Sequence, residues 1–294
     1  MDEEAAILAA IAADPAEDTP RLAYADWLDD HAADRPDPPA ARVRAEFIRV
    51  QCEIKRYEHL SSSELQGYVE LYRRQDVLLT RHRRDLLGPL GDALTERDVV
   101  FDRGFPVEVR LDAPAFLKAA AAVAALRPLP RVHVGNAGPV LNELVDLPDL
   151  GVVTTLTVSG SEYDPFDLGD GGAALLAACP HFRRLEVLEL EGCRVGDLGL
   201  DELASSPALR GVVGLDLSGN EISDTGVVAL VASPLWPRLK YLVLGANPIS
   251  DEGAFALADA GPTAIAYLNV KFTGIGRAGQ QRLLHRKGWK VDLF

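Results

Sequence analysis

The densest group of side chains able to do chemistry lies near the N-terminus, where Tyr24, Asp26, Trp27, Asp29, Asp30 and His31 follow one another closely. Carboxylates beside a histidine are residue types that bind metal ions or transfer protons. On a helix, however, Trp27 and His31 share one face, while the three aspartates spread around the axis. The sequence holds no second cluster to complete such a site. We therefore interpret these charges as a solvated helix end.

The other histidines add no support for catalysis. His133, His181 and His285 have no nucleophile nearby in the sequence, and no glycine-rich phosphate-binding loop follows a predicted strand. The glycines at 169–172 are better explained as a turn that leads into a helix. The sequence therefore predicts no catalytic residue, no bound metal and no cofactor.

One spacing of apolar residues, closed by a polar residue, recurs along the C-terminal half. It runs Leu185-x-x-Leu188-x-Leu190-x-x-Cys193, Val212-x-x-Leu215-x-Leu217-x-x-Asn220, Leu239-x-x-Leu242-x-Leu244-x-x-Asn247 and, more loosely, Ile265-x-x-Leu268-x-Val270-x-x-Thr273. The closing positions are separated by 220 − 193 = 27, 247 − 220 = 27 and 273 − 247 = 26 residues. On this spacing and period the chain is identified as a member of the leucine-rich repeat proteins.

Each repeat predicts a strand, a turn and a helix. Alternating leucines such as Leu215 and Leu217 indicate a short strand with one buried face. Asn at the closing position suits a tight turn, because its amide bonds free backbone groups. Ser223 and Ser250 then predict helix N-caps, followed by acidic residues in the first turn. Units of this kind resemble the ribonuclease-inhibitor-like branch, whose helices line the convex side.

Weaker copies precede these repeats. Residues 153–161 and 129–137 keep the spacing, and 104–111 supply a first strand with a helix at 116–126. An inserted loop is expected at 162–168. The last repeat has Arg277 where earlier copies have Asp, and it leads into a basic cap that closes with Trp289 and Phe294. We therefore predict a leucine-rich-repeat domain at 91–294, with about seven strands.

Residues 1–90 predict a separate small helical bundle. One stripe of this bundle is Val43, Phe47, Val50, Ile54 and Tyr57, and Ser61 with Glu64 forms a capping box. The segments 20–28, 44–51 and 87–90 resemble the bacterial repeat-companion domain, which accompanies leucine-rich repeats and has no established activity. The predicted fold is thus α/β: a right-handed repeat solenoid with parallel strands concave and helices convex, preceded by an all-α bundle.

Composition limits the cellular setting. The 294 residues carry a net charge of −14, which argues against nonspecific binding to nucleic acid. The basic run 81–84 is the one segment that favours a nucleic-acid partner. Three scattered cysteines suit a reducing compartment, and the chain shows neither a secretory signal nor an apolar run long enough for a membrane helix. We predict a cytoplasmic protein.

The open positions of the predicted strands are the candidate binding surface. Tyr241 and Tyr267 should be neighbours in one column, and Glu189 and Asp216 in the next. Exposed aromatics are typical of interfaces, although the tyrosines also suit support of the cap, and the carboxylates suit plain solvation. The candidate binding residues are Arg131, His133, Thr157, Glu189, Asp216, Tyr241, Tyr267 and Asn269.

The function that these features favour is a non-catalytic interaction module that binds a protein partner on the concave face. The alternative is an enzyme or enzyme regulator, in which the helical bundle carries the activity and the repeats select the substrate.

Overall fold

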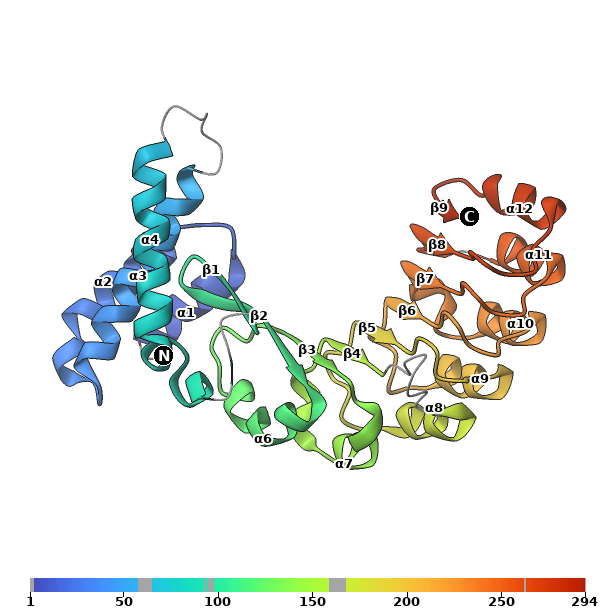
Figure 1. Ribbon diagram of the computed structural model, residues 1–294, viewed down its shortest axis with the longest axis horizontal. Coiled ribbons are helices and arrows are strands. Elements are labelled where there is room, and N and C mark those ends of the chain that lie inside the picture. The colour runs from blue at the N-terminus through green and yellow to red at the C-terminus, as the bar shows by residue number, and fades with distance from the viewer. Residues whose placement is uncertain are drawn as a thin grey trace. The chain divides into compact units, whose positions relative to one another are not determined.

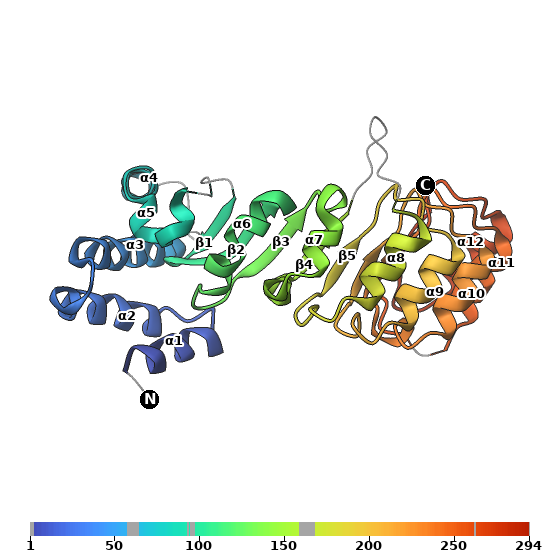
Figure 2. The same cartoon turned by 90° about the horizontal axis from the view of Figure 1, so that it is seen from below.

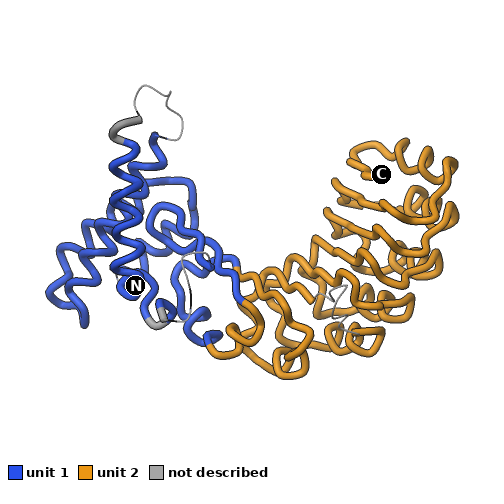
Figure 3. The backbone as a smooth tube through the Cα atoms, viewed as in Figure 1, with its two compact units in different colours: residues 1–111, 119–131 blue, residues 112–118, 132–294 orange. Residues whose placement is uncertain are grey.

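The computed structural model describes residues 3–57, 65–92, 94, 98–158, 168–261 and 263–293. The chain folds into two compact units, which Figure 3 shows in different colours: unit 1 comprises residues 1–111 and 119–131, and unit 2 comprises residues 112–118 and 132–294. The predicted capping box of Ser61 and Glu64, the predicted loop at 162–168 apart from Leu168, and Phe294 lie outside the described residues.

Unit 1 begins with helices and ends with a hairpin. Its elements are α1 (Glu3–Ala13), α2 (Thr19–Asp30), η1 (Ala32–Asp34), α3 (Pro38–Tyr57), α4 (Leu65–Arg81), α5 (Arg83–Leu87), η3 (Gly88–Asp92), β1 (Val99–Asp102) and β2 (Phe105–Asp112) (Figure 1). Helix α6 (Ala113–Ala124) has residues in both units.

Helix α3 is the centre of unit 1, because it is buried along two stripes. The predicted stripe, with Phe47 and Ile54, packs in one cluster with Leu78 of α4. A second stripe, which includes Ile48, packs in another cluster with Leu28 of α2. The sequence spacing predicted only the first stripe, since alanines carry much of the second.

The hairpin β1–β2 joins this core through its turn. Arg103 (φ 49°) and Gly104 (φ 84°) form the two turn residues, in the left-handed conformation that suits a tight hairpin. A Cβ at position 104 would lie 2.3 Å from Cγ1 of Ile48, so only glycine fits there. Gly104 N donates to Gln51 Oε1 at 2.6 Å. The sequence pattern predicted β2 as a strand but did not predict β1.

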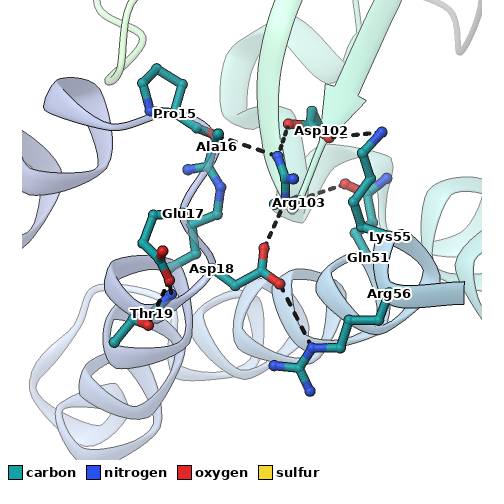
Figure 4. Close-up of polar contacts among 12 residues, drawn as sticks. Pro15, Ala16, Glu17, Asp18, Thr19, Gln51, Lys55, Arg56, Asp102 and Arg103 are labelled. Carbon is teal, nitrogen blue, oxygen red and sulfur yellow. Dashed lines mark hydrogen bonds and ion pairs between the residues drawn. The ribbon is translucent and has the colours of Figure 1, made fainter. Parts of the chain in front are cut away.

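A cluster of ion pairs holds the same turn against the helices (Figure 4). Arg103 lies 2.7 Å from Asp18 through Nε, and its Nη1 donates to Asp102 at 2.8 Å. Arg56 and Lys55 of α3 extend the cluster, at 3.7 Å from Asp18 and 4.0 Å from Asp102. The Arg103 side chain is only 14% exposed, so its charge depends on these partners.

Unit 2 repeats a strand and a helical segment. Its elements are β3 (Arg131–Gly135), η4 (Gly138–Val140), α7 (Leu141–Val145), η5 (Pro148–Val152), β4 (Thr155–Thr157), α8 (Gly169–Ala178), β5 (Val187–Glu189), α9 (Asp197–Ser205), β6 (Gly214–Asp216), α10 (Asp224–Ala232), η6 (Trp236–Arg238), β7 (Tyr241–Val243), α11 (Asp251–Asp259), β8 (Tyr267–Asn269), α12 (Arg277–Leu284) and β9 (Lys290–Asp292).

The strands of unit 2 are parallel and in register, and helices α8 to α12 form a row on the other side (Figures 1 and 2). The central residues Leu156, Leu188, Leu215, Leu242 and Leu268 pair across neighbouring strands and are at most 1% exposed. Each repeat thus buries its leucine against the next repeat. The predicted α/β repeat solenoid, with helices before it in the chain, is confirmed.

The asparagines at the closing position connect neighbouring repeats. Asn220 Oδ1 accepts from Cys193 N at 3.1 Å and Val195 N at 2.9 Å, and its Nδ2 donates to Leu190 O at 2.7 Å. Asn247 Nδ2 likewise donates to the preceding repeat, at Leu217 O, 2.8 Å away. The sequence analysis predicted that Asn bonds the free groups of a turn; the structure shows that many of these groups belong to the repeat before.

A second connection runs through the aspartates at the helix N-termini. Asp224 Oδ1 accepts from Ser250 N at 2.8 Å and Gly253 N at 2.9 Å, both in the next repeat. Asp170 and Asp251 make the equivalent pairs of bonds, and Asp197 Oδ1 accepts from Ser223 N at 2.8 Å. We call this series the aspartate ladder. The predicted serine caps are also confirmed, with Ser223 Oγ accepting from Thr225 N and Ser250 Oγ from Glu252 N.

The aspartate ladder explains why a glycine stands in the first turn of these repeat helices. The carboxylate of the preceding repeat occupies the space that a Cβ atom would fill: a Cβ at Gly226 would lie 2.4 Å from Asp197 Oδ1, and one at Gly253 would lie 2.5 Å from Asp224 Oδ1. At the position of these aspartates α12 carries Arg277, and Asp251 of α11 is the last carboxylate of the ladder in the described chain.

The first prediction concerns Gly226→Ala. Replacing an ordinary helical glycine by alanine stabilises a protein by roughly 0.5–1 kcal/mol, but here the new methyl group displaces the Asp197 carboxylate. We expect a loss of about 2 kcal/mol in the free energy of unfolding, measured by denaturant unfolding followed by circular dichroism. Gly171→Ala in α8 is the control, because a Cβ there meets nothing within 4 Å. A stabilising Gly226→Ala would contradict the role of the ladder.

The second prediction concerns Arg103→Asn in unit 1. Asparagine tolerates the left-handed backbone of the turn, so the change isolates the loss of the ion pairs with Asp18 and Asp102. We expect local stability to fall by about 2 kcal/mol, measured by hydrogen exchange of α2 and α3. The exposed pair of Arg73 with Glu70 supplies the control Arg73→Gln, which should change nothing. Equal protection in both variants would argue against the cluster.

Candidate functional site

The face of the unit 2 sheet that is turned away from helices α8 to α12 carries two columns of side chains. The tyrosine column consists of His133, Thr155, Val187, Gly214, Tyr241, Tyr267 and Lys290. The carboxylate column consists of Thr157, Glu189, Asp216, Val243, Asn269 and Asp292. The two columns alternate with the buried leucines, so their side chains stand on the opposite face of the sheet.

The tyrosines form a stacked pair. The ring centroids of Tyr241 and Tyr267 are 4.8 Å apart with an angle of 10° between the ring planes. Tyr267 donates its hydroxyl to Asp292 Oδ2 at 2.8 Å, and Lys290 Nζ lies 5.6 Å from the Tyr267 ring centroid. Among the described residues no carboxylate accepts the Tyr241 hydroxyl and no cation lies over its ring, and Tyr241 is 44% exposed. The predicted adjacency of these residues is confirmed.

The carboxylates of Glu189 and Asp216 lie beside each other in register, as predicted. Glu189 Oε2 accepts from Thr157 Oγ1 at 2.7 Å, and Asp216 Oδ1 accepts from Ser218 N at 2.9 Å and Ser218 Oγ at 2.6 Å. Within the part of the chain that the structure describes, no cation forms an ion pair with either of them. Their negative charge is held in place but not neutralised.

The pKa values of both tyrosine hydroxyls are raised on this face of the sheet. Desolvation and the nearby carboxylates of Asp216 and Glu189 raise the pKa of Tyr241 above its ordinary value. The hydrogen bond to Asp292, together with desolvation, raises the pKa of Tyr267. Both phenols therefore stay neutral and able to donate hydrogen bonds at every physiological pH.

The structure brings most of the predicted binding residues together. Thr157, Glu189, Asp216, Tyr241, Tyr267 and Asn269 lie on consecutive strands from β4 to β8. His133 and Arg131 lie on β3, with His133 opposite Thr155 and Arg131 nearer the start of the strand. Lys290 and Asp292 were not among the predicted binding residues, because their segment was interpreted as a cap. The alternation of polar and apolar residues from Lys290 to Leu293 was the available signal.

The N-terminal group of chemical side chains serves packing and pairing. Asp26 and Asp29 each accept from Arg49 of α3, at 2.7 Å. The rings of Trp27 and His31 stack 4.5 Å apart, on one helix face as predicted. Among the described residues no group of three or more His, Cys, Asp or Glu side chains is placed to hold a metal ion.

The basic run at 81–84 is partly engaged within unit 1. His82 Nδ1 lies 2.8 Å from Asp85 Oδ2, and Arg83 Nε donates to Gly91 O at 3.0 Å. These contacts hold the run against its own helix and the following turn, which leaves fewer free donors for phosphate groups.

Comparison with known proteins agrees with the repeat architecture. A family model described as Leucine Rich repeat matches residues 183–204, 214–231 and 238–258. The chain therefore contains leucine-rich repeats, which are recognisable from β5 to α11.

Among solved structures, an internalin from Listeria monocytogenes is similar, with 15% sequence identity and a TM-score of 0.33. The match covers 55% of this chain and 39% of that chain, so it spans well under half of the internalin. No curated protein matches the sequence. Across the described residues, every helix is too short or too polar to cross a membrane.

The third prediction follows from the hydrogen bond between Tyr267 and Asp292. The carboxylate stabilises the neutral phenol, so Asp292→Asn should lower the pKa of Tyr267 toward about 10. The pKa of Tyr267 is higher in the folded than in the unfolded protein. The hydrogen bond to Asp292 therefore stabilises the fold fully below the unfolded-state pKa, and this contribution is lost as pH rises through the folded-state pKa. NMR titration of the tyrosine rings measures the shift. Asp259→Asn on α11 is the control, and a Tyr267 pKa unchanged by Asp292→Asn would contradict the assignment.

Proposed function

We propose that the protein is a non-catalytic interaction module, which binds a protein partner on the face of the unit 2 sheet defined by the tyrosine and carboxylate columns. The observation that carries this proposal is the stacked pair of Tyr241 and Tyr267, with Tyr241 44% exposed beside carboxylates that have no cationic partner among the described residues. Tyrosine contributes large, rigid contact area to interfaces, and such anchors dominate binding energy.

The hydrogen bonding of this face supports recognition rather than chemistry. Glu189 is bonded to Thr157, Asp216 to its own turn, and Tyr267 to Asp292, so each polar side chain is held in one orientation. Preorganised side chains lose little entropy on binding. Among the described residues of this face, no nucleophile lies beside a general base. The alternative, an enzyme whose activity lies in the helical bundle, would need such a pair in unit 1. We therefore favour the binding module.

The finer parts of the proposal concern family and setting. We propose that residues 1–90 form a repeat-companion domain and 91–294 the repeat domain, and that the repeats are of the ribonuclease-inhibitor-like type. Support comes from the helices α1 to α5 and from the regular strand–helix units. We further propose a cytoplasmic, bacterial protein. The three cysteines, Cys52, Cys179 and Cys193, are buried free thiols, which suits a reducing compartment.

The fourth prediction tests the proposed binding face with Tyr241→Ala/Tyr267→Ala. Loss of both rings removes the aromatic anchor, so capture of cellular proteins by the immobilised full chain should fall at least about tenfold for the specific partner, as expected for a hot spot. The readout is quantitative mass spectrometry of the captured proteins.

The matched control removes apolar groups from the helix side of the same repeats. Val228 and Phe255 are 54% and 39% exposed on α10 and α11, so Val228→Ala/Phe255→Ala should leave capture unchanged. Both variants must unfold at the temperature of the parent protein. An identical set of captured proteins for the tyrosine variant would refute binding at this face.

A further inference from the structure

We propose that the open ring face of Tyr241 receives the guanidinium of an arginine in a partner protein, with Glu189 and Asp216 as its counter-ions. This inference rests on the proposed function and specifies the chemistry of the partner: an exposed, arginine-containing segment. Three independent features of the tyrosine and carboxylate columns support it.

The first feature is an asymmetry in the tyrosine stack. Tyr267 covers one face of the Tyr241 ring. On the other side the neighbour in register is Gly214, which has no side chain to cover the ring. The 44% exposure of Tyr241 agrees with one covered and one open face. Val187 pairs with Gly214 on the next strand of the column and borders the space above Gly214. A Cβ atom built at Gly214 would lie 3.2 Å from Val187 Cγ2.

The second feature is the arrangement at the opposite end of the stack. There the chain supplies its own cation, as Lys290 Nζ lies 5.6 Å from the Tyr267 ring centroid. Asp292 lies two residues along the same strand and accepts the Tyr267 hydroxyl. One end of the tyrosine pair thus already combines an aromatic ring, a cation and a carboxylate. The Tyr241 end has the ring and the carboxylates, but the described part of the chain places no cation there.

The third feature is the placement of the two carboxylates. Asp216 lies two residues beyond Gly214 on β6, a step of about 7 Å, and Glu189 pairs with it in register on β5. Each uses one oxygen for the bonds to Thr157 or Ser218, which leaves Glu189 Oε1 and Asp216 Oδ2 for a ligand. Beside desolvation, the charges of Asp216 and Glu189 raise the pKa of Tyr241, as expected for carboxylates near its hydroxyl.

These features favour arginine over other cations. A planar guanidinium stacks on an aromatic face and at the same time directs several N–H donors at carboxylate oxygens. An ammonium group is a compact point charge and gains less from the flat ring. A metal ion would need a third ligand, and the described residues provide no such group. The net charge of −14 also speeds the approach of a basic partner.

The fifth prediction uses a random-peptide phage library selected on the immobilised full chain. We expect arginine to be enriched among the bound clones, and the best clone is then synthesised with a fluorescent label. A second peptide carries citrulline, which has the same shape but no charge, in place of arginine. Fluorescence anisotropy should show binding weakened about tenfold, or about 1.4 kcal/mol, by this single change.

The protein variants locate the contact. The single variant Tyr241→Ala and the double variant Glu189→Gln/Asp216→Asn should each lower the affinity for the arginine peptide about tenfold. Tyr241→Phe, which keeps the ring, should bind the peptide as tightly as the parent protein does. Asp201→Asn/Glu202→Gln removes the same charge from exposed positions of α9 and should have no effect. Equal affinity for the citrulline peptide, or equal binding by Tyr241→Ala, overturns the proposal.

The outcome also separates this inference from the proposed function. If the tyrosine double variant loses its cellular partners but the library yields no arginine, the face binds proteins by another chemistry and only the arginine assignment fails. If the double variant keeps its partners and no peptide distinguishes the variants, both proposals fail.

Discussion

The aspartate ladder is the interaction on which the rest of unit 2 depends. Each strand and helix is too short to bury its own leucine, so every repeat needs a fixed neighbour. Asp224 holds its repeat to the next one by accepting hydrogen bonds from backbone N–H groups at the start of the next helix, whose N-terminus carries partial positive charge. Gly226 and Gly253 are then required, because any larger residue would occupy the space of the carboxylate. Stacking and helix capping are thus one interaction.

The asparagines add a further connection between repeats, in the turn between each strand and the helix that follows it. Asn220 and Asn247 bond the backbone of the preceding repeat, so each repeat is held to a neighbour at its turn and at its helix. These bonds and the buried leucines hold the repeats together, so the stacking does not depend on the side chains of the open face of the sheet. Its side chains are free to differ from repeat to repeat, as Thr157, Glu189, Asp216 and Val243 do.

The last strand shows how a terminal element becomes part of a surface. Strand β9 covers the edge of β8, which an open sheet must protect. It also places Lys290 against the Tyr267 ring and Asp292 against its hydroxyl. The cap therefore orders one side of the tyrosine pair and leaves the other side, above Gly214, exposed.

The sequence alone determined the repeat architecture of unit 2. The alternation of leucines such as Leu215 and Leu217 has the period of a strand. The return of this pattern every 27 residues from Leu188 to Leu215 and Leu242 predicts that the strands are neighbours, so the adjacency of Tyr241 with Tyr267 could also be predicted. Local patterns also predicted the serine caps and one stripe of α3. What the sequence did not show was which backbone groups Asp224 and Asn220 would bond, because those donors belong to other repeats. Only the tertiary structure decided that β1 pairs with β2, that Arg103 sits among two carboxylates, and that Lys290 joins the tyrosine column. Each of these depends on contacts between residues far apart in the chain, which local periodicity does not encode.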